Sequence, residues 1–266
     1  MALNKEHPAY VIIYAAVIAA LFTGGIMAVD QLTEQRVEIN KQIRRDKALV
    51  AVFDLGEITD LSNAEIVELR ENRIEAIENT LPTPDGPDTL YIAYDRPKTE
   101  TGAEIVGYAF PIRGTGFWAE ITGVLGVTAD LKQTTGVAFL SHTETPGLGG
   151  RITTDLDWLE KWRGRKLLPP VNGRYLNIVK ASEAPEEDEE IYPHSIDAIS
   201  GATGTSLAVM SFINKDIEGF YAAFREILEE GKLSEYKVPS ERLIEIIDET
   251  AKPEQQPGAI GPDVPE

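Results

Sequence analysis

The chain has 266 residues, 42% of them hydrophobic, which is enough for one or two domains with a hydrophobic core. The formal net charge of −19 argues against a nucleic-acid partner, because phosphates require a basic protein face. The absence of cysteine excludes iron–sulfur clusters, disulfides and thioether haem attachment, and three histidines argue against a multi-histidine metal site.

Residues 8–29 form an apolar stretch without a single charged side chain. At about 1.5 Å per residue, such a helix spans a hydrocarbon core of about 30 Å. A cleaved secretory signal is the alternative, since Gly24, Gly25 and Ala28 resemble a cleavage region. However, the stretch is longer than a signal core of about 7–15 residues. We therefore expect residues 1–30 to be a short cytoplasmic segment and an uncleaved single-span anchor.

The charges around this stretch do not give a clear orientation. Before it stand Lys5 and His7, and the basic residues that follow it are Arg36, Lys41, Arg44, Arg45 and Lys47. The positive-inside rule would keep the later domain in the cytoplasm, although long domains can cross a membrane regardless of charge.

Residues 31–96 are expected to form a helical stalk and the first part of the external domain. Apolar residues at helical spacing predict one helix over 31–52 and a second over 63–80, capped by Asn63. The inward-facing positions of the second helix would be Ile66, Leu69, Ile74 and Ile77. Prolines and a glycine in 82–87 end it, and 89–94 follows as a strand.

Residues 103–140 are typical of a β-meander, with short β-rich runs separated by turn residues. The segment from Gly114 to Ala119 fits the dinucleotide pattern G-x-G-x-x-A, but a strand rather than a helix is predicted after it, so we reject that function. Trp118 is expected either in the core or near a ligand. Residues 155–168 predict a short helix and turn, with Trp158 and Trp162 packed in the core.

A small polar stretch from Asp197 to Ser206 precedes a long amphipathic helix predicted over 206–230. A helix N-terminus offers free N–H groups and the positive end of the helix dipole, so it can bind a phosphate. The alternative is that the Ser and Thr residues only cap the helix. Upstream, the acidic run 183–190 is expected to be a solvated loop, and His194 a loop residue. Downstream, Ser240 is predicted to cap a last helix to Ala251, before a disordered tail over 253–266.

The stretch Asp197-x-x-Ser200-Gly201-Ala202-Thr203-x-Thr205 resembles the flavinylation motif of a family of FMN-binding domains. That family includes NqrC, from the sodium-translocating NADH:quinone oxidoreductase, and RnfG, from the Rnf complex. The resemblance implies that Thr205 carries FMN through a phosphoester bond made by a flavin transferase. It also implies that Asp197 takes part in recognition by the transferase, and that residues from Ser200 to Gly204 hold the phosphate.

A second segment, Glu144-Thr145-Pro146-Gly147-Leu148-Gly149, is similar to the family segment that lines the flavin, and Trp118 lies in a turn similar to one near the flavin. His142 before Glu144 is closer to RnfG, whereas the Phe117-Trp118 turn and Ser206 are closer to NqrC. As an alternative, His142 and Glu144 could form a metal or acid–base pair. The expected site residues are thus Thr205, Ser200, Gly201, Ala202, Thr203, Gly204, Glu144, Thr145, Pro146, Gly147, Leu148, Gly149, Trp118 and Asp197, with no metal and no catalytic residue.

The resemblance implies an α+β fold, with one transmembrane helix followed by an FMN-binding domain over 97–232 that has a mainly antiparallel sheet and packed helices. Residues 233–266 are expected to hold the C-terminal helix and the acidic tail. The implied protein is an electron-transfer subunit with covalent FMN in an Rnf- or Nqr-type membrane complex, rather than a catalyst alone. It would be a single-pass protein of the cytoplasmic membrane with its main domain outside. Two alternatives are a stand-alone flavoprotein donating electrons to an external reductase and a non-redox membrane scaffold.

Overall fold

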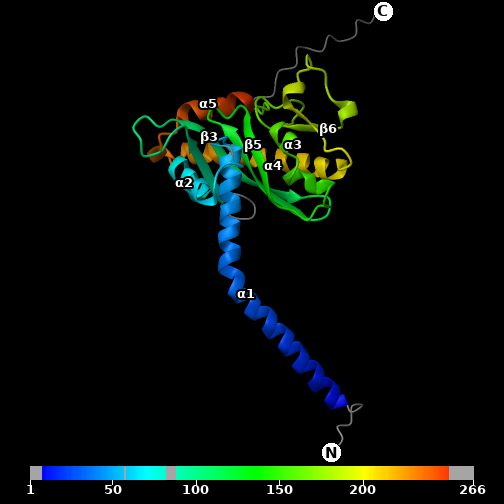
Figure 1. Ribbon diagram of the computed structural model, residues 1–266. Coiled ribbons are helices and arrows are strands. Elements are labelled where there is room, and N and C mark those ends of the chain that lie inside the picture. Colours follow the sequence, from blue (N-terminus) through cyan, green and yellow to red (C-terminus); the bar gives the residue numbers. More distant parts are fainter. Residues whose placement is uncertain (1–7, 57, 82–87, 252–266) are drawn as a thin grey trace, which may run out of the picture. The chain divides into compact units, whose positions relative to one another are not determined.

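The computed structural model of the chain describes residues 8–56, 58–81 and 88–251 (Figure 1). Contacts between residues divide the chain into two compact units, one ending at Arg45 and the other beginning at Asp46. The fold is α+β, as predicted. Its helices are α1 (Pro8–Val52), α2 (Asn63–Arg73), α3 (Leu156–Glu160), α4 (Thr203–Glu229) and α5 (Ser240–Ala251). Short 3-10 turns are η1 (Gly149–Thr153), η2 (Ala181–Glu183), η3 (Tyr192–His194) and η4 (Ser234–Tyr236).

The first unit consists of the apolar start of α1 and the charged turns that follow it. Within the described residues, α1 is the one helix long and apolar enough to cross a membrane, and none of its apolar window is buried. Large side chains such as Ile12, Leu21 and Phe22 are exposed along it. The helix predicted for residues 31–52 is confirmed as the continuation of α1.

The second unit is built on a five-stranded antiparallel sheet whose strands follow one another in sequence order. The strands are β1 (Ile74–Leu81), β2 (Asp88–Tyr94), β3 (Ile105–Thr115), β4 (Glu120–Thr128) and β5 (Thr134–Ser141). A separate parallel pair joins β6 (Asn177–Val179) to β7 (Ser195–Asp197). The meander predicted for residues 103–140 and the strand predicted for 89–94 are therefore confirmed.

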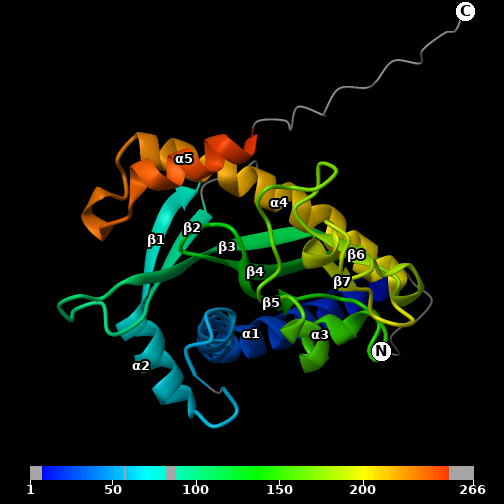
Figure 2. The same cartoon turned by 90° about the horizontal axis from the view of Figure 1, so that it is seen from above.

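Alternation along the central strands gives the sheet one face of large side chains and one of small ones. On β3, Tyr108 and Phe110 are buried toward α4, and the Phe110 ring stacks on Phe220 with centroids 4.1 Å apart. On the opposite face a Cβ at Gly126 would overlap the side chain of Val52, the last residue of α1. The small residues therefore leave room for the end of α1, while α4 and α5 cover the other face (Figure 2).

The helix predicted over residues 63–80 is wrong in its second half and at its cap. Ser62, not Asn63, is the N-cap, and it forms a capping box with Glu65. The helix ends at Arg73, and the next residues pair with β2, with Ile74 opposite Ala93. Apolar residues at positions 74 and 77 fit a helix locally, but pairing with a distant strand overrides this preference.

Other predicted elements agree with the structure more closely. The short helix α3 is capped by Asp155, and Trp158 and Trp162 are both buried, as predicted. Most of the acidic run 183–190 is exposed, and the last helix is present as α5. Ser240 is its first residue rather than its cap, because the Ser240 hydroxyl donates to the carbonyl of Val238. The tail over 253–266 and the turn residues 82–87 lie outside the described residues.

Among the described residues, the far end of β3 is paired with a strand on one side only. The described pairing of β2 with β3 stops at Ala109, while β3 continues beside β4 to Thr115. Pro111 has no N–H to donate, and the N–H of Arg113 donates to Asp216 Oδ2 on α4 at 2.8 Å. Both features discourage another strand from adding at this edge.

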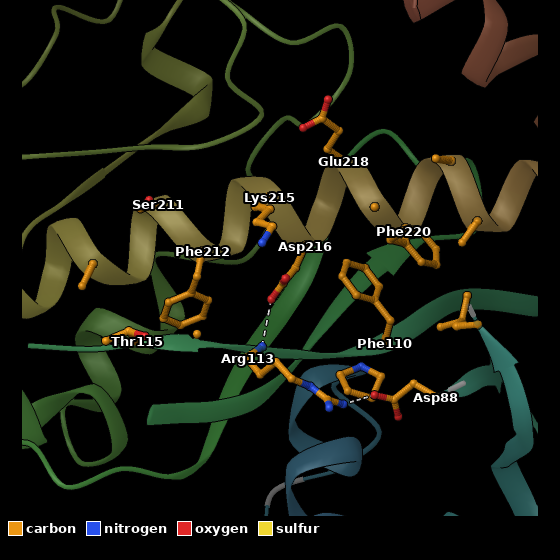
Figure 3. Close-up of a pocket in the computed structure, with 17 residues that line it drawn as sticks. Asp88, Phe110, Arg113, Thr115, Ser211, Phe212, Lys215, Asp216, Glu218 and Phe220 are labelled. Carbon is orange, nitrogen blue, oxygen red and sulfur yellow. Dashed lines mark hydrogen bonds and ion pairs between the residues drawn. The ribbon is translucent and has the colours of Figure 1, made fainter. Parts of the chain in front are cut away.

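A hollow of about 790 Å³ lies between this edge and α4, with the Arg113–Asp88 ion pair on its rim (Figure 3).

The placement of Ile74 in a core strand can be tested by truncation. Ile74 is fully buried among Leu49, Phe53 and Tyr91. We expect Ile74→Ala to lower the free energy of unfolding by about 2–5 kcal/mol, because it leaves a cavity. The measurement is urea unfolding of the full chain in detergent, with the exposed Glu78→Ala as control, expected within about 0.5 kcal/mol of the unchanged protein. An Ile74→Ala loss as small as that of the control would contradict the placement.

Candidate functional site

Three segments far apart in sequence meet at the carboxylate of Glu144. This residue follows β5 and is only 4% exposed. Its Oε1 accepts the backbone N–H groups of Phe117 at 2.8 Å and Trp118 at 3.0 Å. Its Oε2 accepts the hydroxyl of Thr205 at 2.6 Å. One buried side chain thus joins the turn after β3, the loop after β5 and the first turn of α4.

The helix α4 begins at Thr203, three residues earlier than the predicted start at Ser206. Thr205 therefore lies inside its first turn. The N-cap is Ala202, which makes no side-chain cap, so the hydroxyls of the motif do not serve as the usual helix cap. Ser206 instead closes the preceding turn, because its Oγ accepts the N–H of Ile199 at 3.0 Å and donates to the carbonyl of Ala202 at 3.1 Å. This leaves the buried Thr205 hydroxyl bonded to Glu144 alone among the contacts described.

Glycines allow the segments to approach the carboxylate closely. A Cβ at Gly149 would overlap Thr205 Oγ1 and lie 2.7 Å from Glu144 Oε2. A Cβ at Gly116 would lie 2.5 Å from Glu144 Oε1. Since real Cβ atoms do not approach so closely, a larger residue at either position would displace the carboxylate or the hydroxyl.

Exposed apolar side chains form the rim of the site. Trp118 is 66% exposed, so the alternative that it belongs to the core is wrong, and its Nε1 donates to Thr145 Oγ1 at 3.2 Å. Phe117 meets the Trp118 ring edge-on with centroids 5.2 Å apart. Leu148 is also exposed. Large exposed apolar side chains gathered at one place are typical of a surface that binds something.

Phe117 is a site residue that the sequence reasoning did not include. A Cβ at Gly204 would lie 2.7 Å from its ring, so Phe117 packs directly on the first turn of α4. Phe117 lies between Gly116 and Trp118 in the turn that resembles the family, and this position indicates from sequence that Phe117 belongs to the site. The backbone N–H that it gives to Glu144 could not be foreseen from residue type.

Basic side chains flank the motif in a chain that is strongly acidic overall. Lys161 Nζ lies 2.8 Å from Asp197 Oδ2, and Trp158 Nε1 donates to the Asp197 carbonyl at 2.8 Å. Arg151 Nη1 donates to the carbonyl of Ser200 at 3.4 Å, and the same guanidinium forms an ion pair with Asp155. Both cations are paired with carboxylates, so the feature that favours an anion beside the motif is the start of the 27-residue helix.

The two histidines near the motifs have structural partners. His142 Nδ1 accepts the N–H of Glu144 at 3.2 Å, and its Nε2 lies 3.2 Å from Thr153 Oγ1. Since the Glu144 carboxylate faces Thr205 and the turn after β3, the two side chains do not form an acid–base pair. Across residues 8–56, 58–81 and 88–251 there is no cluster of three or more groups suited to a metal.

His194 is buried in η3 rather than placed in a loop as expected. Its Nδ1 lies 3.0 Å from the carbonyl oxygen of Tyr175, and burial lowers its pKa below the ordinary histidine value. It therefore belongs to the structural support of β7, which precedes the motif.

The predicted site residues are only partly brought together. Glu144, Gly149 and Thr205 form its centre, and Trp118, Thr145 and Leu148 its rim. Two predicted residues make no contact with this centre. In the described contacts no hydrogen bond joins Asp197 to Thr205. Gly147 has a positive φ, and no atom lies near the position of a Cβ there. The remaining predicted residues, Ser200, Gly201, Ala202, Thr203, Gly204 and Pro146, lie in the two loops and the helix start.

Comparisons with known proteins identify the same region. Residues 116–218 match the family described as the FMN-binding domain, and this range holds all three segments of the site. The NqrC protein of the Na(+)-translocating NADH-quinone reductase from Yersinia pestis is 34% identical over 133 residues, which cover 50% of this chain and 48% of that protein. The corresponding protein of Pseudomonas aeruginosa is 25% identical over 246 residues, covering 79% of this chain and 92% of that protein. The chain thus matches about half the length of the first relative and most of the second.

Two solved structures share the fold. The NqrC crystal structure from Shewanella oneidensis has a TM-score of 0.56 at 22% identity, covering 70% of this chain and 97% of that one. The corresponding protein from Parabacteroides distasonis has a TM-score of 0.51 at 17% identity, covering 71% and 96%. The resemblance drawn from the motifs is confirmed, because residues 116–218 match the FMN-binding domain and the similar proteins and solved structures are those of NqrC.

Proposed function

We propose that the protein is a membrane-anchored electron carrier whose FMN is attached to Thr205 through a phosphoester. The observation that carries this proposal is the hydrogen bond between the Thr205 hydroxyl and the buried Glu144 inside the family-matched domain. Gly149 packs closely against this hydroxyl, so a phosphoester at Thr205 requires the glycine-rich loop to move away from it.

The residues of the chain would hold and shield this group. Thr205 supplies the hydroxyl, and the N–H groups at the start of α4 stabilise the negative phosphate. Arg151 donates to the Ser200 carbonyl while paired with Asp155, so it would help to fix the turn beside the phosphate. Trp118, Phe117 and Leu148 offer an apolar surface suited to a flat ring. Bound flavin supplies transfer of one or two electrons, at a potential and position that the protein sets.

A tether has a clear physical purpose for a carrier that faces the outside of a cell. A dissociable cofactor would be lost there by dilution, whereas a phosphoester keeps it in place. The apolar stretch of α1 would anchor the protein in the cytoplasmic membrane as a single span. The family topology would place the main domain outside, against the simple count of basic residues after the span.

The relatives favour a place in a larger complex. The proteins from Yersinia pestis and Pseudomonas aeruginosa are both named as parts of the Na(+)-translocating NADH-quinone reductase, so an Nqr-type complex is better supported than an Rnf-type one. The partners would be the other membrane subunits, with a flavin transferase acting during maturation. A stand-alone flavoprotein would not co-purify with such subunits, and a non-redox scaffold would carry no flavin.

The attachment can be tested on a denaturing gel. The full chain is produced together with a flavin transferase and viewed under ultraviolet light. We expect a fluorescent band that is lost in Thr205→Ala, because no other residue supplies this hydroxyl. The matched control is Ser211→Ala, which removes an exposed hydroxyl from the same helix and should keep the band. A dark band from the unchanged chain would support the scaffold alternative.

Two glycine variants test the crowding around the hydroxyl. Gly149→Ala would place a Cβ against Thr205 Oγ1, so we expect at least a tenfold slower attachment and a loss of about 1–3 kcal/mol in stability. Gly219 lies within α4 with open space at its Cα, so Gly219→Ala should raise stability by about 0.5–1 kcal/mol and leave attachment unchanged. Equal attachment rates for both variants would contradict the assigned geometry.

The topology can be measured because the natural chain has no cysteine. A single cysteine placed by Glu187→Cys in the exposed acidic loop is treated with a membrane-impermeant maleimide in intact spheroplasts. We expect labelling without lysis if the domain is external. Lysed spheroplasts serve as the control for reactivity, and labelling that requires lysis would instead support the orientation given by the charge count.

A further inference from the structure

A second hollow, of about 550 Å³, lies at the end of the sheet far from Glu144. It is bounded by the end of β2, the start of β3 and the segment from η4 to Pro239. Tyr108 on β3 lines it, eight residues before Gly116, so at about 3.4 Å per residue the two sites are about 27 Å apart. A ligand in this hollow would therefore not touch Thr205.

The buried hydroxyl of Tyr108 has no hydrogen-bond partner among the described residues. The side chain is the most buried of those that line the hollow, so it forms the deepest part of the wall. Burial, and after it the nearby Tyr94 hydroxyl, raises the pKa of Tyr108, so this hydroxyl stays neutral and can both donate and accept. Since Tyr94 lines the same hollow, the Tyr108 hydroxyl lies on that side of its ring. An unpartnered buried polar group is costly and indicates a partner that the described chain does not supply.

The charged groups that line the hollow favour a cation. Four carboxylates and two ammonium groups are present, those of Glu75, Glu100, Glu104, Glu235, Lys98 and Lys237. Lys98 Nζ lies 2.7 Å from Glu75 Oε2, so these two charges balance each other. Just outside the hollow, Arg96 is paired with Asp95. Three carboxylates thus remain against the single ammonium group of Lys237.

Two further tyrosines give the hollow aromatic walls. Tyr94 and Tyr236 line it together with Tyr108. The face of a tyrosine ring is electron-rich and attracts a cation. The Tyr236 hydroxyl donates to Glu235, which raises the pKa of Tyr236. This hydroxyl is therefore already bonded, whereas that of Tyr108 is not.

We propose that this hollow binds a small organic ammonium ion, whose N–H donates to the Tyr108 hydroxyl oxygen and whose charge is balanced by the carboxylates around it. The volume suits a small molecule. An anion would meet an excess of carboxylates. A metal ion is disfavoured, because no group of three or more acidic or histidine side chains within the described ranges is suited to hold one. Binding involves no covalent step and does not depend on flavin attachment.

Thermal unfolding of the full chain in detergent tests the chemistry of the ligand. Ethanolamine is the probe, and ethylene glycol is the neutral control of similar size. We expect ethanolamine to raise the melting temperature as its concentration increases, because a ligand that binds the folded state stabilises it. Ethylene glycol, and sodium chloride at matched ionic strength, should not do so. An equal rise with ethylene glycol, or a larger rise with sodium acetate, overturns the proposal.

The variant Tyr108→Phe removes the unpartnered hydroxyl and keeps the ring. We expect at least tenfold weaker binding of ethanolamine, because a hydrogen bond to a charged group is lost. Without ligand, the same variant should melt a few degrees above the unchanged protein, because the cost of burying the hydroxyl disappears. The control Tyr192→Phe changes a partly exposed tyrosine and should alter neither value. A lower melting temperature with unchanged affinity would assign Tyr108 a structural partner and overturn the proposal.

A matched pair of carboxylate variants gives a readout that does not disturb the core. Glu104→Gln removes an exposed carboxylate at the hollow and should weaken ethanolamine binding about two- to fivefold. Glu120→Gln removes an exposed carboxylate at the other end of β3 and should leave binding unchanged. Equal affinities in the two variants contradict the proposed site, and this comparison decides alone if Tyr108→Phe fails to fold.

The same ammonium group can come from a dissolved amine or from the headgroup of phosphatidylethanolamine. Detergent micelles containing this lipid are therefore compared with micelles containing phosphatidylglycerol, which has no ammonium group. A rise in melting temperature with phosphatidylethanolamine alone assigns the site to the lipid, and a rise with ethanolamine assigns it to a dissolved amine. A response to neither overturns the proposal, and covalent flavin on Thr205 should be unaffected in every case.

Discussion

The hydrogen bonds of the Glu144 carboxylate hold the candidate site together. The residue itself follows β5, and its partners come from the β3–β4 turn and from α4. An unpaired buried carboxylate is costly, so the three segments stabilise one another only when all are in place. Gly116 and Gly149 make this possible, because the backbone on both sides of the carboxylate must come closer than any side chain would allow.

The sheet and α4 give this arrangement a fixed base. The buried face of α4 packs on β3. Phe220 stacks on Phe110, and Phe224 contacts Tyr108. Since the helix is anchored along its length, the position of its first turn is set by the core. Thr205 is therefore presented by a helix packed on the core, whereas the loops that meet it are short and rich in glycine.

Much of the site could be predicted from sequence because its residues lie in compact motifs. The turn with Trp118, the segment from Glu144 to Gly149 and the stretch around Thr205 were each identified, and the structure brings them together. The contact between Glu144 and Thr205 joins residues 61 positions apart, and local patterns do not encode such a pairing. The same reason explains the error at Ile74, where apolar spacing suited a helix but the partner strand β2 lay further along the chain.

The burial of Thr205 means that the proposed attachment of FMN would require a part of the site to open. Thr205 is 4% exposed, and α4 cannot unwind without exposing the core that it covers. The loop from Glu144 to Gly150 is held by weaker means, including N–H groups of Leu148 and Gly150 that both donate to the Thr145 carbonyl. Opening this loop would free the hydroxyl while the helix and sheet stay folded. The loop is thus the element that the proposed attachment would have to displace, because Gly149 lies directly against the hydroxyl.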